Sequence, residues 1–212
     1  AQEARLIADA EIVISKKVAL RREHLQAAPN LRMIALAATG SDNIDLDAAR
    51  ERQIVVSNIR DYAVRSVPEH VFALIFALRR NICAYRQSVK EGRWQEAQQF
   101  CYFDYPIRDL AGSTLGLIGS GSLGQAVATM GRALGMKVIF AQRRGQTIVS
   151  NADDRLPFEQ VLEQADILSL HCPLTAETQN MLGMAEFERM APRRPLLINT
   201  ARGGLIDNQA LE

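Results

Sequence analysis

The sequence predicts an α/β protein built from two domains of doubly wound parallel sheet. Short apolar runs of strand length alternate with segments of helical periodicity along almost the whole chain, which is typical of parallel sheets covered by helices. Glycines at positions 119, 121 and 124 stand between a predicted strand and a predicted helix, the setting of a βα turn. A later apolar run ends at Asn199 and leads into Arg202, at the strand end where such folds place functional side chains.

The first part of the chain is expected to alternate strands with helices. Apolar residues cluster over strand length at Glu11–Ile14, Met33–Ala37 and Ile54–Val56. Helical patterns lie between them at Arg21–Ala28 and Leu46–Arg52. This order gives the βαβ units that parallel strands require.

A long helix and an aromatic segment are expected to join the two domains. Val67–Lys90 carries apolar residues at helical spacing and is predicted to form a long hinge helix that ends the first domain, residues 1–90. Its charged pair, Arg79 and Arg80, is expected to mark emergence into solvent or a crossing to the next domain. Residues 91–108 hold Trp94 and several Phe and Tyr residues, and we interpret them as a linker fixed by aromatic packing. The second domain is predicted to span residues 109–212.

The second domain has the sharper pattern. We expect strands at Thr114–Ile118, Met136–Ala141, Asp166–Leu170 and Pro195–Ile198. We expect helices at Ser122–Leu134, Phe158–Glu163 and Ala185–Met190, with a loop from the second strand through Asp154. Such a run of βα units predicts a doubly wound sheet.

Composition excludes several classes of function. The chain has 212 residues, 48% hydrophobic and 23% charged content and a net charge of +1, which gives no basis for binding nucleic acid or an anionic membrane. No apolar stretch is long enough to span a bilayer. The three cysteines and three histidines lack metal-ligand spacing, so we predict no metal site and a cytoplasmic protein with reduced thiols.

The glycine pattern predicts a phosphate-binding turn. Gly119 permits a tight turn, Gly121 lets a pyrophosphate approach the backbone, and Gly124 lets the helix pack on the strand. The amides at the start of the helix then meet the phosphate charge. We therefore expect a dinucleotide to contact Gly119, Ser120, Gly121, Ser122, Leu123 and Gly124. The alternative is a glycine turn that binds nothing.

The residues after the next strand bear on which dinucleotide is bound. A carboxylate there would bind the adenosine ribose of NAD, but the chain has Gln142, Arg143 and Arg144. No carboxylate opposes a 2′-phosphate, and two guanidinium groups are available to pair with it. The sequence therefore predicts NADP in preference to NAD. The alternative is two solvated arginines in an NAD-dependent protein.

Further motifs extend the pattern over essentially the whole chain. They are, in order, Ala38–Asp45, Val67–His70, Gly92–Trp94, Leu110–Gly116, the glycine turn, His171–Thr175 and Ile198–Asp207. With this set the chain resembles the D-isomer-specific 2-hydroxyacid dehydrogenases, most of all the glycerate dehydrogenase and hydroxypyruvate reductase group. The resemblance implies a flavodoxin-like substrate domain and a Rossmann dinucleotide-binding domain, and a homodimer formed through the latter.

The resemblance also implies roles in substrate binding. Arg202 matches the catalytic arginine that binds the substrate carboxylate and polarises its carbonyl, and a fixed bidentate cation suits a 2-keto acid. Taken alone, Arg202 would be read as half of a structural ion pair. Thr39 and Gly40 match the loop whose backbone amides hold the substrate carboxylate from the other domain.

The remaining matches concern the cofactor. The loop beside the adenosine corresponds to His171, Cys172, Pro173 and Thr178, and the lining of the nicotinamide corresponds to Thr200 and Ala201. His171 follows a different strand from Arg202, so we expect it to be structural or to line the cofactor rather than to be catalytic.

One part of the family pattern is missing. The family's general acid is a histidine supported by a glutamate, both downstream of the arginine motif, and neither can be placed before Glu212. We therefore expect a chain truncated at both ends and inactive alone, whose full-length parent reduces hydroxypyruvate or glyoxylate with NAD(P)H. Three alternatives stay open: a phosphoglycerate or D-lactate type dehydrogenase, a dinucleotide-sensing binding protein like the corepressors built on this fold, and a pseudoenzyme.

Overall fold

A computed structural model describes residues 2–145 and 154–212 of the chain. The chain divides into two compact units, residues 1–62 and residues 63–212. Each unit has its own parallel sheet and its own buried apolar core. The predicted α/β class with parallel sheets is therefore confirmed. The assignment of residues 1–90 to a substrate domain, 91–108 to a linker and 109–212 to a dinucleotide-binding domain stays a prediction.

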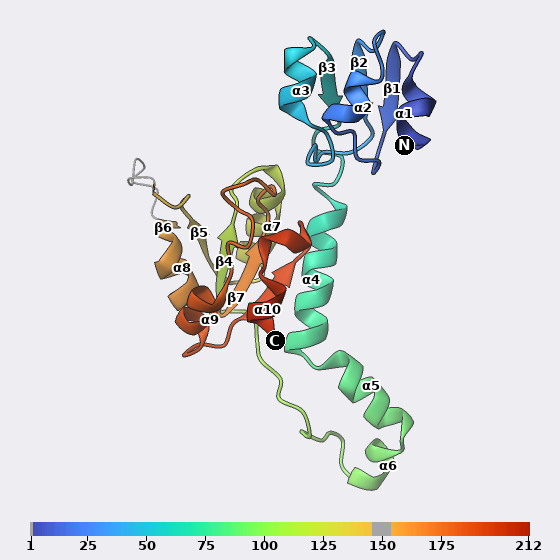
Figure 1. Ribbon diagram of the computed structural model, residues 1–212. Helices are drawn as coiled ribbons and strands as arrows, with labels where there is room; N and C mark the ends of the chain where they lie inside the picture. Colours follow the sequence, from blue (N-terminus) through green and yellow to red (C-terminus); the bar gives the residue numbers. More distant parts are fainter. Residues whose placement is uncertain (1, 146–153) are drawn as a thin grey trace. The chain divides into compact units, whose positions relative to one another are not determined.

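The first unit is a sheet of three parallel strands with three helices (Figure 1). The strands are β1 (Ile12–Ser15), β2 (Met33–Leu36) and β3 (Val55–Asn58), paired in that order. The helices are α1 (Gln2–Ile7), α2 (Arg22–Gln26) and α3 (Leu46–Glu51). The strands and helices predicted here are present with ends shifted by one or two residues. Helix α1 was not predicted.

The hinge helix is the main correction to the sequence analysis. The structure has two helices, α4 (Ser66–Arg79) and α5 (Ile82–Lys90), where one long helical segment was expected, and the first helix ends at the charged pair Arg79 and Arg80. The break lies at Asn81, whose φ of 51° places it in the left-handed region, where a helix cannot continue and asparagine is tolerated. The Asn81 side-chain amide donates to the carbonyl oxygen of Pro106 at 2.5 Å. This contact fixes the turn between the helices.

The aromatic segment folds back on α5. It contains the unpredicted helix α6 (Arg93–Ala97) and then an irregular stretch. The Tyr85 ring packs on those of Tyr102 and Tyr105, with ring centres 5.5 and 5.2 Å apart. The Tyr85 hydroxyl donates to the carbonyl oxygen of Tyr105 at 2.7 Å. The aromatic residues thus pack among themselves and leave others, such as Phe100 and Phe103, exposed.

The second unit holds a five-stranded parallel sheet in the order β6-β5-β4-β7-β8. Its strands are β4 (Thr114–Ile118), β5 (Lys137–Ala141), β6 (Arg155–Leu156), β7 (Ile167–Leu170) and β8 (Leu196–Asn199). Its helices after the aromatic segment are α7 (Ser122–Ala133), α8 (Phe158–Gln164), α9 (Met184–Met190), the 3₁₀ turn η1 (Gly203–Leu205) and α10 (Asn208–Leu211). Strand β6 and the last two elements were not predicted.

Helices cover both faces of this sheet (Figure 1). On one face α4 and α7 bury Val71, Phe72 and Val127 against the strands. On the other face α8 and α9 bury Phe158, Val161 and Met190. Strands β4 and β7 are apolar on both sides for this reason, which is why their continuous apolar runs were readable in the sequence.

Candidate functional site

The segments predicted to bind a dinucleotide all lie at the carboxyl ends of the strands in the second sheet. The strand order places the segments after β5, β4, β7 and β8 one beside the next along this edge. They begin at Gln142, Gly119, His171 and Thr200. The chain passes from β4 to β5 on one side, while β7 lies on the other. This reversal point is where doubly wound sheets bind ligands.

Two glycines of the turn after β4 are required by the fold itself. Gly119 has a φ of 109°, and a Cβ there would lie 2.5 Å from the carbonyl oxygen of His171. A Cβ on Gly124 would lie 2.1 Å from the carbonyl oxygen of Gly119. No real Cβ contact is so short, so a side chain at either position would push α7 or the β7 end away from the turn.

Gly121 has the opposite property. It caps α7 with ordinary extended dihedrals, φ −72° and ψ −174°. In the part of the chain that the structure describes, no atom lies within 4 Å of the place where its Cβ would be. The first turn of α7 has neither a side-chain cap nor an acidic residue. An anion would satisfy the amides of this first turn and meet the positive end of the helix dipole. The backbone at Gly121, Ser122 and Leu123 thus fits a phosphate group.

Ser120 is held by an arginine that the sequence analysis missed. Arg155 Nη2, from β6, donates to Ser120 Oγ at 3.0 Å. Both residues are partly buried. The sequence signal for Arg155 was weak, because it lies in a two-residue strand at the end of a segment expected to be a loop.

The two arginines after β5 have different surroundings. Arg144 forms an ion pair with Glu186, lies 3.9 Å from Glu159 and stacks on the Phe158 ring at 4.3 Å. Burial raises the pKa of Glu186, but hydrogen bonds from Gly183 N and Arg144 outweigh it, so the net pKa is lowered and the carboxylate stays charged. Arg143 is exposed, as is Arg144, and Gln142 is partly buried.

The segment after β7 packs directly against the turn. His171 N donates to the carbonyl oxygen of Ile118 at 2.7 Å, and His171 Nε2 lies 2.9 Å from Ser169 Oγ. Burial lowers the pKa of His171 to about 4, so the ring is neutral near pH 7. It is therefore suited to shape an uncharged wall of the site.

The rest of this loop is fixed by its own hydrogen bonds. The Thr178 hydroxyl donates to the carbonyl oxygen of Pro173 at 2.7 Å. Cys172 Sγ lies 3.7 Å from Met181 Sδ, and burial raises the pKa of the Cys172 thiol. Cys172 is thus an unreactive packing residue at this edge.

The turn after β8 presents Arg202 beside an unsatisfied hydroxyl. Asn199 holds the turn, since its side-chain amide donates to the carbonyl oxygen of Arg202 at 2.9 Å and its side-chain oxygen accepts from Ala201 N at 3.1 Å. Arg202 Nη1 donates to the carbonyl oxygen of Ala201 at 3.0 Å. Thr200 Oγ1 is buried and has no hydrogen-bond partner among residues 2–145 and 154–212. A buried polar atom of this kind points to a ligand group that completes it.

Thr39 and Gly40 lie in the first unit, in the loop after β2. The Thr39 hydroxyl donates to the carbonyl oxygen of Ile59 at 2.8 Å, and the Asn58 side chain donates to the carbonyl oxygen of Thr39 at 2.7 Å. Within the described part of the chain, the amides of Thr39 and Gly40 have no backbone acceptor. The loop therefore offers two fixed amide donors, which suit a carboxylate.

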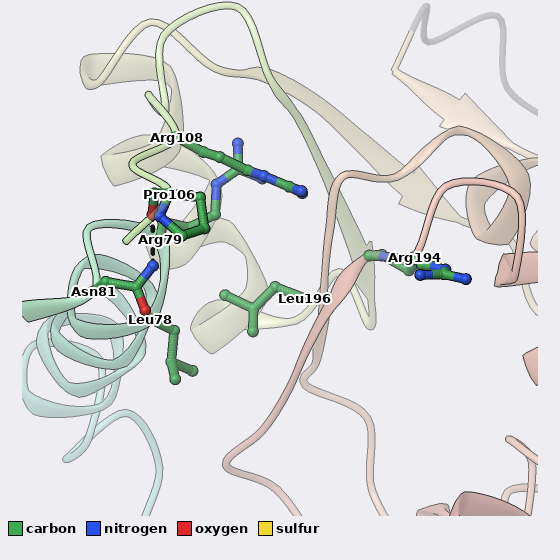
Figure 2. A pocket seen from close by; sticks show the side chains of 8 residues that line it. Leu78, Arg79, Asn81, Pro106, Arg108, Arg194 and Leu196 are labelled. Carbon is green, nitrogen blue, oxygen red and sulfur yellow. Dashed lines mark hydrogen bonds between the residues drawn. The ribbon is translucent and has the colours of Figure 1, made fainter. Parts of the chain in front are cut away.

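A pocket of about 310 Å³ lies elsewhere in the second unit. Its lining includes Arg79, Asn81 and Arg108, together with Arg194 and Leu196 at the amino end of β8 (Figure 2). Figure 2 shows the Asn81 side chain bonded to Pro106 at its rim. Because the amino end of β8 is opposite the edge that carries the glycine turn, this pocket is separate from the candidate site.

Neither a metal cluster nor a membrane span is found in the regions that the structure describes. Residues 2–145 and 154–212 contain no group of three His, Cys, Asp or Glu side chains placed to hold a metal ion. In the same ranges no helix combines the length and the apolar character needed to cross a bilayer.

Comparison with known proteins identifies relatives for nearly the whole chain. A family model described as D-isomer specific 2-hydroxyacid dehydrogenase, NAD binding domain, matches residues 72–212. Glycerate dehydrogenase of Methylorubrum extorquens is 50% identical over 202 residues, which are 95% of this chain and 62% of that protein. A putative 2-hydroxyacid dehydrogenase of Haemophilus influenzae is 45% identical and is covered to 66%. The chain thus spans less than two thirds of the length of these relatives.

Two solved structures of the same architecture were determined with a nicotinamide cofactor. The acyclic imino acid reductase Bsp5 in complex with NADPH and D-Arg has a TM-score of 0.87 and 31% identity, covering 98% of this chain and 65% of that one. D-Lactate dehydrogenase from Aquifex aeolicus, complexed with NAD and lactic acid, has a TM-score of 0.85 and 31% identity, covering 98% and 61%. The dinucleotide-binding fold of the second unit is thereby established.

Proposed function

This chain belongs to the D-isomer specific 2-hydroxyacid dehydrogenases, and we propose on that basis that the whole protein reduces a small 2-keto acid to the D-2-hydroxy acid with NADPH. Hydroxypyruvate and glyoxylate are the proposed substrates. The relatives named glycerate dehydrogenase, hydroxypyruvate reductase and glyoxylate reductase support this choice.

The observation that carries the proposal is the cradle at Gly121. The backbone at Gly121 leaves open space at the start of α7, between Gly119 and Gly124, where a side chain would clash. Such a space fits the pyrophosphate of a dinucleotide. The buried hydroxyl of Thr200 fits a polar group at the other end of such a ligand. The nicotinamide, when bound, supplies the hydride. The protein's part is to hold both reactants and to stabilise the developing charge.

Arg202 is the proposed catalytic residue. Its guanidinium, on a turn fixed by Asn199, presents a planar fork that pairs with a carboxylate and stabilises negative charge on the carbonyl oxygen as it is reduced. Thr39 and Gly40 are proposed to bind the substrate carboxylate through their amides. Neutral His171 is proposed to line the cofactor, with Cys172, Pro173, Thr178 and Ala201.

NADPH is proposed as the preferred cofactor. Within the described residues, the segment after β5 has arginines and no carboxylate where an NAD-binding protein would carry an acidic residue. The imino acid reductase that resembles this chain was solved with NADPH, and the D-lactate dehydrogenase with NAD. The fold accommodates both cofactors, so the proposal depends on the charges in this chain.

The test is keto-acid reduction by the whole protein. We expect NADPH oxidation with hydroxypyruvate or glyoxylate, and a fall in kcat/KM of about 100-fold in Arg202→Lys, because lysine keeps the charge but loses the planar fork. NADPH affinity should be unchanged in that variant. Cofactor binding without reduction of any 2-keto acid would overturn the proposal and favour a dinucleotide sensor.

A homodimer and a cytoplasmic location complete the proposal. The segment formed by α5, α6 and the following residues exposes Trp94, Phe100 and Phe103, the last two by more than three quarters. Exposed aromatic residues clustered on one segment are typical of an interface. The mass of the whole protein in solution, measured by light scattering, should be twice the chain mass; a monomer would refute the dimer.

A further inference from the structure

Arg155 is a candidate for a role in the choice of cofactor, and this role rests on the proposed binding of NADPH. Arg155 lies in β6, opposite Phe140 of β5 in the parallel pairing. Strands β6 and β5 lie on one side of β4, and β7 and β8 lie on the other. If the nicotinamide lies toward Thr200 after β8, Arg155 lies on the adenosine side of the turn. The residues after β5, to which sequence reasoning assigned the adenosine ribose, are its neighbours.

The Arg155 side chain reaches across β5 to the turn. Its Nη2 atom donates to Ser120 Oγ at 3.0 Å, and the residue is partly buried. A guanidinium carries five N–H donors. Among the described residues, the bond to Ser120 is the one hydrogen bond that the Arg155 side chain makes. Ser120 thus holds one edge of the guanidinium, and the remaining donors suit a further acceptor.

The charge of Arg155 is not balanced by a carboxylate among the described residues. The acidic residue next to it in sequence, Asp154, is paired with Arg132 Nη2 at 2.7 Å. A partly buried cation without a counter-ion costs free energy unless a ligand supplies the charge. Phosphate, like carboxylate, matches the planar fork of arginine.

Arg144 is less suited to the same task. Its guanidinium is already paired with Glu186, whose carboxylate also accepts from Gly183 N at 2.9 Å and so caps α9. A phosphate at Arg144 would compete with this pair. Arg143 is exposed. The pKa of Glu177 is lowered by the hydrogen bond from Thr175 and, to a smaller extent, by the charge of Arg143. Arg155 and Arg143 are therefore the cations best placed to receive a ligand.

We propose that Arg155 is a specificity-determining residue that binds the 2′-phosphate on the adenosine ribose of NADPH, with Ser120 holding its guanidinium in place. The pyrophosphate common to both cofactors is expected at the amides of Gly121 and the start of α7. Arg155 approaches from the β6 side and so meets the group that only NADPH carries.

The test uses adenosine phosphates that isolate this group. Binding of 2′,5′-ADP and of 5′-AMP to the whole protein is measured by titration calorimetry. Arg155→Ala should weaken 2′,5′-ADP by about 10- to 100-fold, the range for a charge-assisted hydrogen bond, and 5′-AMP by less than about threefold. In Arg144→Ala, the losses of affinity for 2′,5′-ADP and for 5′-AMP should differ by less than in Arg155→Ala. Arg189→Ala removes an exposed charge paired with Glu163 and should leave both affinities unchanged.

Two further measurements keep the outcome clear. Arg155→Lys keeps the charge and tests the proposal even where the alanine variant fails to fold. Its loss of affinity for 2′,5′-ADP should lie between those of the unaltered protein and Arg155→Ala. Equal losses for both probes, or no loss in either variant, would overturn the proposal. Reduction of hydroxypyruvate with NADH by the unaltered protein tests the proposed function separately, because that cofactor lacks the 2′-phosphate.

Discussion

Alanine at Gly121 should block the dinucleotide and leave the fold intact. No atom of the described residues lies within 4 Å of the position of the new Cβ, and the backbone is extended, so the methyl group fits there. Glycine is a better helix cap than alanine, and we expect a loss of stability of about 1 kcal/mol or less.

The effect on binding is larger. The new methyl group occupies the space through which a phosphate approaches the first amides of α7. Holding the phosphate away from these amides removes at least one charge-assisted hydrogen bond, worth about 1.5–3 kcal/mol. The dissociation constant for NADPH should therefore rise by about 10- to 150-fold.

Gly124→Ala is the matched comparison. The same methyl group at Gly124 would lie 2.1 Å from the carbonyl oxygen of Gly119, and neither backbone segment can yield without moving α7. Overpacking of this kind costs about 1–3 kcal/mol or more. This variant should lose stability and cofactor affinity together, whereas Gly121→Ala loses affinity alone.

Thermal unfolding and fluorescence titration with NADPH measure the two quantities on the same preparations. Because the chain has two compact units, shifts in unfolding temperature are compared rather than absolute free energies. Wild-type affinity in Gly121→Ala would refute the assignment of the open space to a phosphate. Equal destabilisation of the two variants would refute the steric argument.

Two further predictions concern buried groups at the same edge. Burial lowers the pKa of His171 to about 4, so the stability it contributes is complete above about pH 6.5 and falls by about 3 kcal/mol as the pH drops to about 4. His171→Gln should reduce the fall in unfolding temperature between pH 7 and pH 4.5. The same fall in the variant and in the unaltered protein would contradict this. Thr200→Val removes a buried unpaired hydroxyl and should stabilise the free protein by about 1 kcal/mol. Thermal unfolding with NADPH should show no such gain, and equal gains would mean that the hydroxyl meets no ligand.

The sequence predicted elements of the fold where burial shows as a continuous apolar run. Strands β4 and β7 are buried on both faces, so their apolar runs marked them to within a residue of their ends. Helix α4 and helix α5 were merged, because both follow the same helical period. Their break depends on the bond from Asn81 to Pro106, 25 residues away, and no periodicity reports such a contact.

The site shows the same limit. The glycine turn was predicted because the residues that it requires, three glycines, lie within one short segment. Arg155 was missed because its position beside Ser120 depends on the register between β5 and β6. Arg144 was noticed for its charge, yet its ion pair with Glu186 joins segments 42 residues apart. Charge can be read from a sequence, whereas the partner that neutralises it cannot.

The three glycines of the turn carry different information. Gly119 and Gly124 are needed because other backbone atoms occupy the space of their side chains, and a protein that had lost its cofactor would still need them to keep α7 on β4. Gly121 faces open space, so no neighbour among the described residues requires it. The first and third glycines therefore report a fold, and only the second reports a ligand. In a related chain, a larger residue at the position of Gly121 beside intact flanking glycines would predict a stable domain without a bound dinucleotide.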